Sequence, residues 1–161
     1  MGKDGETHQG IFDISFMSAI PNLTIVAPKD AEELMQATKF AADFNGPIAV
    51  RFPRGKAFFQ HVPSKFEYGK SEILKEGENV AIIAVGGMVE ETKKAVELLE
   101  ENNKNVTFVN ARFVKPLDTA LLDALAGNHK LIVTVEENVR NGGFGEHVAA
   151  YMDCLLYTSP S

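Results

Sequence analysis

The chain has 161 residues, of which 45% are hydrophobic and 24% are charged, the composition of a globular protein. Its formal net charge is −6, and no basic stripe or run of lysines and arginines occurs, so we expect neither nucleic acid nor a membrane as a partner. Its apolar runs have the length of strands, far short of the ~20 residues of a membrane span. The single cysteine, Cys154, excludes a disulfide framework and a cysteine-rich zinc site, and fits a reducing, cytoplasmic compartment.

The first half of the chain predicts a parallel strand–helix–strand unit. Residues 22–27 and 48–52 are short runs rich in β-branched residues, typical of buried strands. Between them, Asp30 and Glu33 have the spacing of a capping box, which predicts a helix over 31–44. A right-handed crossover would make both strands parallel in one sheet. The predicted inner face of the helix contains Ala31, Leu34, Met35, Thr38, Ala41 and Ala42.

Residues 56–79 predict a connection between two domains, because glycines and Pro63 interrupt a stretch that has no sustained period. Four aromatic residues indicate that this connection packs against the rest of the chain: Phe58, Phe59, Phe66 and Tyr68. We therefore place the first domain at residues 1–68 and the second at residues 69–153.

The second domain repeats the α/β alternation, so we expect a mostly parallel sheet. Strands are predicted at 80–85, 106–110 and 131–135, and helices at 89–102, from Asp118 to Gly127, and after Gly145. The residues predicted to face inward are Val89, Thr92, Val96 and Leu99 in the first helix, and Val148, Ala149 and Met152 in the last. Residues 154–161 break the helical pattern, and we interpret them as a non-native tail.

The motif Asp4-Gly5-Glu6-Thr7-His8-Gln9-Gly10 puts a carboxylate and an imidazole on a glycine-flanked loop. His8 titrates near neutrality and suits proton transfer or hydrogen bonding to a substrate carbonyl. A lone loop histidine is more often simply solvated, and Asp4-Gly5 is a common turn pair. The motif as a whole therefore carries the prediction that Asp4 and His8 are catalytic.

The motif Val50-Arg51-Phe52-Pro53-Arg54-Gly55 ends a predicted strand with two arginines. Ligands of open α/β sheets bind beyond the carboxyl ends of strands, and an arginine fork there suits a phosphate or a carboxylate. A surface ion pair with a nearby glutamate is an equally good reading. Because the two side chains would point to opposite sides of an extended segment, one arginine is expected to be structural, and we prefer Arg54 as the ligand.

Three other features carry weaker signals. Gly142, Gly143 and Gly145 resemble a phosphate cradle at a helix start, but they lack a nucleotide fingerprint, and close backbone packing is the better reading. Glu136 and Glu137 suit a solvated turn or a subunit contact more than a catalytic role. The remaining histidines have no metal-ligand spacing and are read as structural: His61, His129 and His147.

The segments DGETHQG, FMSAIPNLTIVAPKDAEEL and GPIAVRFPRG resemble the 1-deoxy-D-xylulose-5-phosphate synthases, a family of the transketolase superfamily. The segments VAIIAVGGMV, NARFVKPLD and VTVEENVRNGGFGEHV are similar to the C-terminal domain of that family. The resemblance covers residues 2–153. It implies an α/β fold in which part of a parallel-sheet pyrimidine-binding domain is followed by a transketolase-type C-terminal domain.

The resemblance also implies an activity. Members are transferases that condense pyruvate with glyceraldehyde 3-phosphate, with loss of CO2, and their product feeds isoprenoid and thiamine biosynthesis. They use thiamine diphosphate and Mg2+, and they work as cytoplasmic homodimers. Asp4 and His8 match the family's aspartate and histidine that contact substrate and support proton transfer, and Arg54 matches the arginine that holds the acceptor phosphate. Arg51 matches a family position to which we assign no catalytic role.

The family's cofactor motifs are missing from this sequence. No Gly-Asp-Gly metal motif occurs, and the glutamate that activates the cofactor is expected upstream of residue 1, so no cofactor or metal ligand is assigned within the chain. We therefore expect a fragment that is inactive alone. A transketolase-like protein, a 2-oxoacid dehydrogenase β-type subunit, and a non-catalytic interaction module of a split enzyme remain alternatives.

Overall fold

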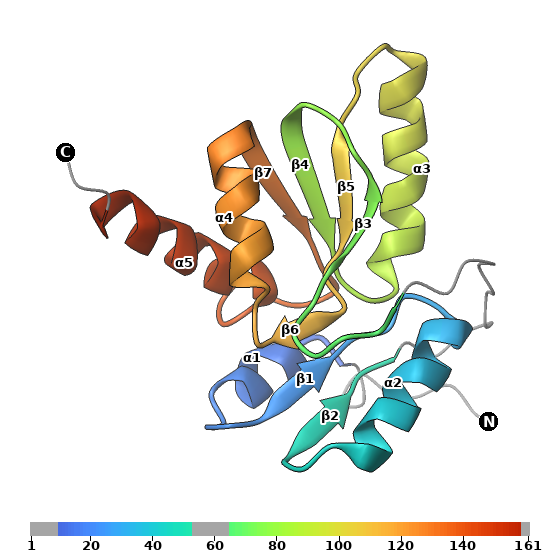
Figure 1. Cartoon of the computed structure of the whole chain (residues 1–161), viewed down its shortest axis with the longest axis vertical. Coiled ribbons are helices and arrows are strands. Elements are labelled where there is room, and N and C mark those ends of the chain that lie inside the picture. Colours follow the sequence, from blue (N-terminus) through green and yellow to red (C-terminus); the bar gives the residue numbers. More distant parts are fainter. Residues whose placement is uncertain (1–9, 53–64, 159–161) are drawn as a thin grey trace.

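The computed structural model describes residues 10–52 and 65–158, with side chains up to Cys154 in the last helix. The described chain forms two sheets, each with its own helices (Figure 1). The first sheet has the strand order β2-β1-β6, with β1 at Thr24–Val26, β2 at Ile48–Val50 and β6 at Phe113–Lys115. Strands β1 and β2 are parallel, as predicted, and β6 is antiparallel to β1. Helices α1 (Asp13–Ser18) and α2 (Ala31–Asp43) belong to this part of the molecule.

The second sheet has the order β3-β5-β4-β7, with bounds Glu72–Lys75 for β3, Asn79–Ala84 for β4, Thr107–Asn110 for β5 and His129–Val135 for β7. Strand β4 is parallel to both β5 and β7, and only β3 is antiparallel, so the expected mostly parallel sheet is confirmed. Helix α3 (Met88–Glu101) covers one face, while α4 (Thr119–Asn128) and α5 (Phe144–Thr158) lie on the other side (Figure 1).

Helix α2 begins as the sequence predicts, but its buried face differs. The side chain of Asp30 accepts a hydrogen bond from the backbone N–H of Glu33 at 2.8 Å, which caps the helix. The carboxylate of Glu33 accepts from the N–H of Lys29 and not from that of Asp30, so the capping box is only half formed. Glu33 and Ala37 are buried, whereas Met35 is 60% exposed, and the predicted apolar face is therefore wrong. The buried side of the helix includes Glu33, which belongs to a buried ionic cluster. Hydrophobic periodicity does not detect a buried charged residue.

Two helix ends lie later than predicted. Helix α4 continues through Gly127 to Asn128, because its carboxyl end leads directly into β7 without a glycine turn. Helix α5 continues to Thr158, past the expected interruption at Cys154. The inner face of α3 is confirmed, since Val89, Thr92 and Val96 are buried and Leu99 is partly buried. In α5, Val148 is buried but Ala149 is exposed.

Three elements were not predicted: α1, β3 and β6. The most consequential is β6, because it comes from the second half of the chain yet pairs with β1 of the first sheet. Only Ala111 and Arg112 separate it from β5 of the second sheet. The chain thus passes from one sheet into the other within two residues.

One hydrophobic core runs through both sheets. It joins Ile14, Ile25 and Ala27 of the first part to Ile83 and Val109 of the second, with Leu122, Leu125, Phe144 and Val148 from α4 and α5. A second cluster lies between α3 and its sheet face. A third cluster is aromatic and includes Phe66 and Tyr68, whose rings lie 5.5 Å and 5.8 Å from that of Phe113. The predicted packing of the connection is confirmed for these two, while Phe58 and Phe59 lie outside the described residues.

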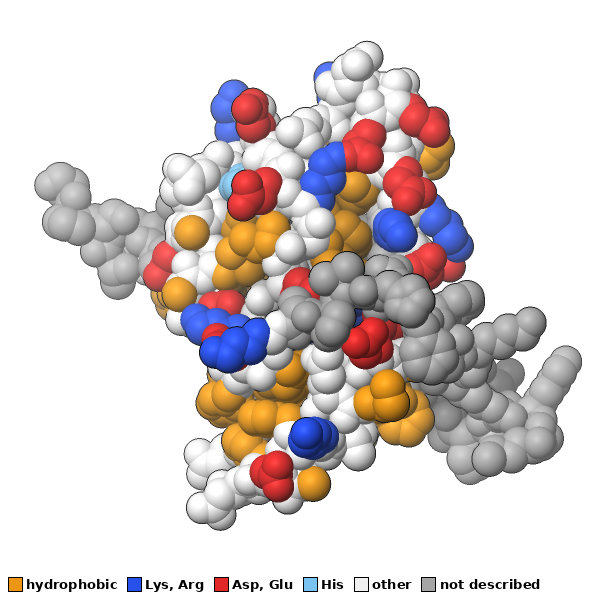
Figure 2. Space-filling view, turned by 45° about the vertical axis from the view of Figure 1, so that its right-hand side comes forward, with side chains coloured by type: hydrophobic (Ala, Val, Ile, Leu, Met, Phe, Trp, Pro, Cys, Tyr) orange, Lys and Arg blue, Asp and Glu red, His pale blue; other side chains and the backbone are white. Residues whose placement is uncertain are grey.

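Acidic and basic side chains are interspersed on the surface in Figure 2, and apolar side chains reach it as well. Among the described residues, the large apolar side chains exposed around α1 are Ile11, Phe12, Phe16 and Ile20. In the described part of the chain, no helix has the length and apolarity needed to cross a bilayer.

Candidate functional site

Arg51 lies at the carboxyl end of β2, beside the end of the parallel strand β1. Its backbone N–H donates to the carbonyl of Val26 at 2.7 Å, which continues the β1–β2 pairing by one residue. Its side chain is 12% exposed, and its Nε donates to Oδ2 of Asp13, at the start of α1, at 2.8 Å. Its Nη2 donates to the carbonyl of Gly10 at 3.1 Å. The edge formed by two parallel strands thus holds the segment that follows the first sequence motif.

Arg51 also contacts the loop after β7. Its Nη2 lies 3.3 Å from the carbonyl oxygen of Glu137, and its Nη1 lies 3.6 Å from the carboxylate of Glu137. Nearby, the N–H of Val139 donates to the carbonyl of Ile11 at 3.0 Å, and the hydroxyl of Ser15 donates to the carbonyl of Asn141 at 2.7 Å. Residues 10–15 are therefore joined to residues 137–141 along a seam between the two halves of the molecule.

The predicted catalytic and substrate-binding residues Asp4, His8 and Arg54 lie outside the described residues. The structure describes their neighbours in sequence: Gly10 is the last residue of the first motif, and Arg51 belongs to the second. The contact between Arg51 Nη2 and the Gly10 carbonyl brings the two motifs' described ends together. The contacts of Arg51 with Asp13 and Glu137 agree with the reading that one of the two arginines is structural.

The glycine-rich start of α5 is filled by a side chain of the chain itself. The carboxylate of Glu136 accepts hydrogen bonds from the N–H groups of Phe144 and Gly145 at 2.9 Å and 2.8 Å. These donors would otherwise face an incoming anion. A Cβ added at Gly143 would lie 2.6 Å from the carbonyl oxygen of Val139. The close-packing interpretation is therefore confirmed at Gly143, and Glu136 has a structural task.

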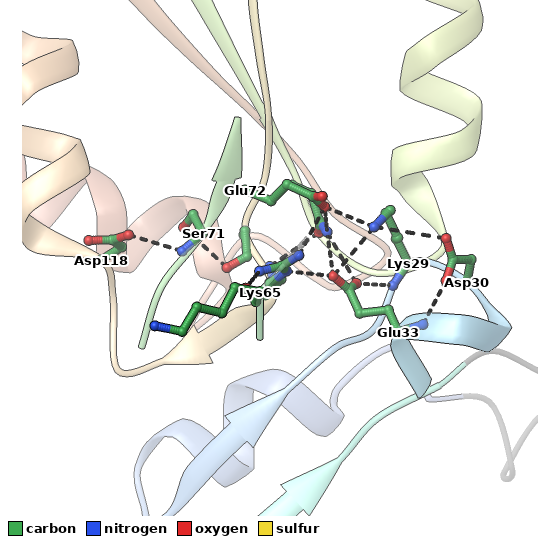
Figure 3. Close-up of polar contacts among 10 residues, drawn as sticks. Lys29, Asp30, Glu33, Lys65, Ser71, Glu72 and Asp118 are labelled. Atoms are coloured by element: carbon green, nitrogen blue, oxygen red, sulfur yellow. Dashed lines mark hydrogen bonds and ion pairs between the residues drawn. The ribbon is translucent and has the colours of Figure 1, made fainter. Parts of the chain in front are cut away.

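A buried ionic cluster connects α2 to the second sheet (Figure 3). The carboxylate of Glu33, 2% exposed, accepts from Arg112 Nε at 2.6 Å and from Asn110 Nδ2 at 2.9 Å. Lys29 Nζ lies 2.8 Å from Glu72 and 3.5 Å from Glu33. Arg112 also lies 3.3 Å from Glu72. Asp30 lies 3.8 Å from Lys29 Nζ. Two cations thus face three carboxylates in a buried site, where each charge depends on the others.

The charges around Lys29 determine its protonation. Burial lowers the pKa of this ammonium, but the carboxylates of Glu33, Glu72 and Asp30 outweigh burial, so the pKa is raised above its usual 10.5. Lys29 therefore remains a cation throughout the neutral range, and it supports the two carboxylates that Arg112 also contacts.

Arg112 has an unusual backbone as well as a buried side chain. Its φ is +56°, a conformation that non-glycine residues rarely adopt. Its carbonyl accepts from the N–H of Ala27 at 2.7 Å, and its Nη1 donates to the carbonyl of Lys65 at 2.9 Å. Sequence reasoning missed Arg112. The available signal was a charged residue inside an apolar run, but its partner Glu33 is 79 positions away.

Thiamine diphosphate and Mg2+ would need ligands for the metal ion and hydrogen-bond donors for the diphosphate. Within residues 10–52 and 65–158, no group of three or more His, Cys, Asp and Glu side chains is arranged to hold a metal ion. The helix start that most resembled a phosphate site already holds Glu136. The described residues therefore provide neither a cluster of metal ligands nor a free phosphate site at the start of α5.

Comparison with known proteins identifies the family. Residues 69–159, more than half of the chain, match the model of the transketolase C-terminal domain, and residues 1–59 match that of the transketolase pyrimidine binding domain. The chain belongs to the transketolase family. The expected fold class is confirmed by these matches and by the two α/β sheets.

Curated relatives of this transketolase-family chain carry a more specific name. The 1-deoxy-D-xylulose-5-phosphate synthase of Clostridium perfringens (strain SM101 / Type A) is 48% identical over 95% of the chain and 25% of the relative. The enzymes of the same name from Lachnoclostridium phytofermentans and Caldanaerobacter subterraneus subsp. tengcongensis are 45% and 47% identical over 94% and 92% of the chain. The resemblance that the motifs predicted is confirmed. The chain spans about a quarter of the length of these relatives.

Two solved structures share the fold. A split gene transketolase, solved as an inactive beta4 tetramer, is 32% identical, with a TM-score of 0.81 over 96% of this transketolase-family chain and 51% of its own. The transketolase of Campylobacter jejuni is 20% identical, with a TM-score of 0.64 over 98% of the chain and 29% of its own. The second comparison supports the fold alone.

Proposed function

We propose that this chain is a fragment of a synthase that condenses pyruvate with glyceraldehyde 3-phosphate to 1-deoxy-D-xylulose 5-phosphate, with loss of CO2. The observation that carries the proposal is the identity of 45–48% to curated enzymes of that name along more than nine-tenths of the chain. The motifs that contain His8 and Arg54 support it, because their described ends meet at the Gly10–Arg51 contact.

In this proposal, three residues act on the substrates. Asp4 and His8 contact the substrate, with His8 transferring protons near neutral pH. Arg54 binds the phosphate of glyceraldehyde 3-phosphate through charge-assisted hydrogen bonds. Arg51 cannot share that task well, because its guanidinium already faces Asp13 and Glu137.

The cofactor chemistry belongs to the longer protein. Thiamine diphosphate with Mg2+ would supply the electron sink for decarboxylation, and their ligands are expected in parts of the longer protein outside this chain. The longer protein is proposed to be a transferase that works as a homodimer, whereas the 161-residue chain alone is proposed to be inactive. A transketolase-like or 2-oxoacid dehydrogenase β-type activity is the enzymatic alternative.

A second candidate function is a non-catalytic module of a split enzyme. It is supported by the 32% identity and TM-score of 0.81 to a split gene transketolase. In that case the chain would bind a separate polypeptide that carries the cofactor site, and activity would appear only in the mixture.

The decisive experiment replaces the matching segment of the Clostridium perfringens synthase with residues 1–153 of this chain. We expect formation of 1-deoxy-D-xylulose 5-phosphate and CO2 from pyruvate and glyceraldehyde 3-phosphate, with no ketol transfer between sugar phosphates. His8→Ala should abolish turnover, and Arg54→Met should raise the KM for glyceraldehyde 3-phosphate more than that for pyruvate.

Lys104→Met, a change at an exposed residue, serves as the matched control. Ketol transfer without decarboxylation would favour the transketolase alternative. Product formation by the purified 161-residue chain, supplied with thiamine diphosphate and Mg2+, would refute the proposed inactivity. Activity that appears only after mixing with a separate cofactor-domain chain would favour the split-enzyme candidate.

A further inference from the structure

Arg51 is anchored to a rigid part of the fold. Its backbone N–H extends the pairing of β2 with β1 by donating to Val26, so the start of its side chain is fixed by two parallel strands. The guanidinium then meets two separate segments: residues 10–13, through Asp13 at 2.8 Å and the carbonyl of Gly10 at 3.1 Å, and the loop after β7, through the carbonyl of Glu137 at 3.3 Å. Groups held on strands and locked by hydrogen bonds are placed more accurately than groups held on loops alone.

The charges around Arg51 argue against substrate binding. Asp13 and Glu137 both bring carboxylates to the guanidinium, at 2.8 Å and 3.6 Å. A phosphate that approached this position would be repelled by both carboxylates before it reached the cation. The geometry therefore separates Arg51 from Arg54, although the two are three positions apart in one motif.

The contact with Gly10 relates Arg51 to the proposed catalytic histidine. Only Gln9 stands between His8 and Gly10 in the sequence. The residues after Gly10 are fixed by two further bonds, from Val139 N–H to Ile11 and from Ser15 to the carbonyl of Asn141. Among the described bonds of this seam, the Arg51–Gly10 bond is the one closest in sequence to His8. It therefore fixes the position of Gly10, two residues after His8.

We propose that Arg51 is a positioning residue: it fixes the Gly10 carbonyl against the Glu137 loop and thereby limits the positions open to His8. The inference rests on the proposed function of His8. Arginine suits the task because its planar fork donates in several directions at once, whereas a lysine ammonium at the same place would satisfy Asp13 but would not span both carbonyls.

The test has two independent readouts. In the 161-residue chain, Arg51→Met should increase amide hydrogen exchange over residues 11–16 by about tenfold or more, because the seam opens locally. In the grafted synthase, the same change should lower kcat by about 10- to 100-fold and alter the KM for glyceraldehyde 3-phosphate by less than about threefold. Arg51→Lys should lie between wild type and Arg51→Met in both readouts, and Lys104→Met should match wild type.

Each result has a defined meaning. Unchanged exchange in Arg51→Met, or a tenfold rise in KM with kcat preserved, would overturn the proposal, since the second result is that of a phosphate ligand. If the synthase that carries unmutated residues 1–153 of this chain is inactive, the proposed function fails. The hydrogen-exchange data alone then decide whether Arg51 fixes the seam. If Arg51→Met does not fold, Arg51→Lys and Asp13→Asn replace it, and faster exchange at residues 11–16 with a normal thermal transition is the supporting result.

Discussion

Replacing Arg112 by methionine is expected to lower the free energy of unfolding by about 3 kcal/mol. Its side chain is 3% exposed, and the change removes contacts with Glu33 at 2.6 Å, Glu72 at 3.3 Å and the carbonyl of Lys65 at 2.9 Å. Removing one partner of a buried ion pair costs about 3–5 kcal/mol, because the other charge stays buried without compensation. We expect the lower end, because Lys29 remains 2.8 Å from Glu72 and 3.5 Å from Glu33.

The same reasoning predicts that the costs are not additive. Glu33→Gln alone leaves Arg112 with less negative charge around it, whereas Glu33→Gln combined with Arg112→Met removes one charge of each sign. The double variant should therefore be more stable than the sum of the single costs implies, by about 1–3 kcal/mol. Urea denaturation followed by far-ultraviolet circular dichroism at neutral pH measures all three variants.

Arg140→Met is the control for this series, because Arg140 is an exposed arginine and its replacement should change stability by less than about 0.5 kcal/mol. Additive single costs, or an Arg112→Met variant as stable as the control, would refute the expected coupling between these charges. Either outcome would mean that the cluster is solvated well enough for its charges to act independently.

Four further predictions concern Lys29, two glycines and Phe16. The pKa of Lys29 is raised above 10.5, so its stabilising effect is complete below about pH 10.5 and is lost as the pH rises through the raised value. In urea titrations, the stability difference between wild type and Lys29→Met should therefore shrink as the pH rises from about 10.5 through the raised pKa. A constant difference would contradict this. Gly127→Ala should stabilise the chain by about 0.5–1 kcal/mol, because Gly127 lies inside α4 and an added Cβ meets nothing within 4 Å. Gly77→Ala should destabilise it by about 1–3 kcal/mol, because the Cβ would lie 2.3 Å from the carbonyl carbon of Val106; thermal melts of both variants test the contrast. The isolated chain should associate through its exposed apolar surface, which includes the Phe16 side chain at 63% exposure. Phe16→Glu should therefore reduce the mass measured by light scattering. A wild-type chain that is monomeric and melts sharply would argue against this association.

Hydrophobic periodicity predicts most of the fold because most elements have one apolar face. Strand β4 and helix α3 lie within one residue of their predicted bounds, since each buries a regular apolar pattern. Helix α2 shows where this signal fails. Its buried side includes Glu33, whose burial depends on Arg112 and Lys29. No local sequence pattern predicts a buried charge, because its partner Arg112 is 79 positions away.

In the candidate site, too, some residues were predicted from the sequence and others required the structure. Motif resemblance selected Asp4, His8 and Arg54, and these remain predictions because they lie outside the described residues. The separate role of Arg51 required the positions of Asp13 and Glu137, which come from distant parts of the sequence. The pairing of β6 with β1 joins residues that are far apart in the sequence, so it is visible only in the structure.

The pairing of β6 with β1 has a consequence for what happens when the backbone is cut. A single break anywhere between residues 52 and 65 would yield two polypeptides, each of which holds one part of the first sheet. Strand β6 and the shared core around Ile25 and Val109 would keep these pieces associated after cleavage. A nicked chain should therefore migrate as one particle under native conditions and as two bands in denaturant, although its sequence divides into two separate family domains.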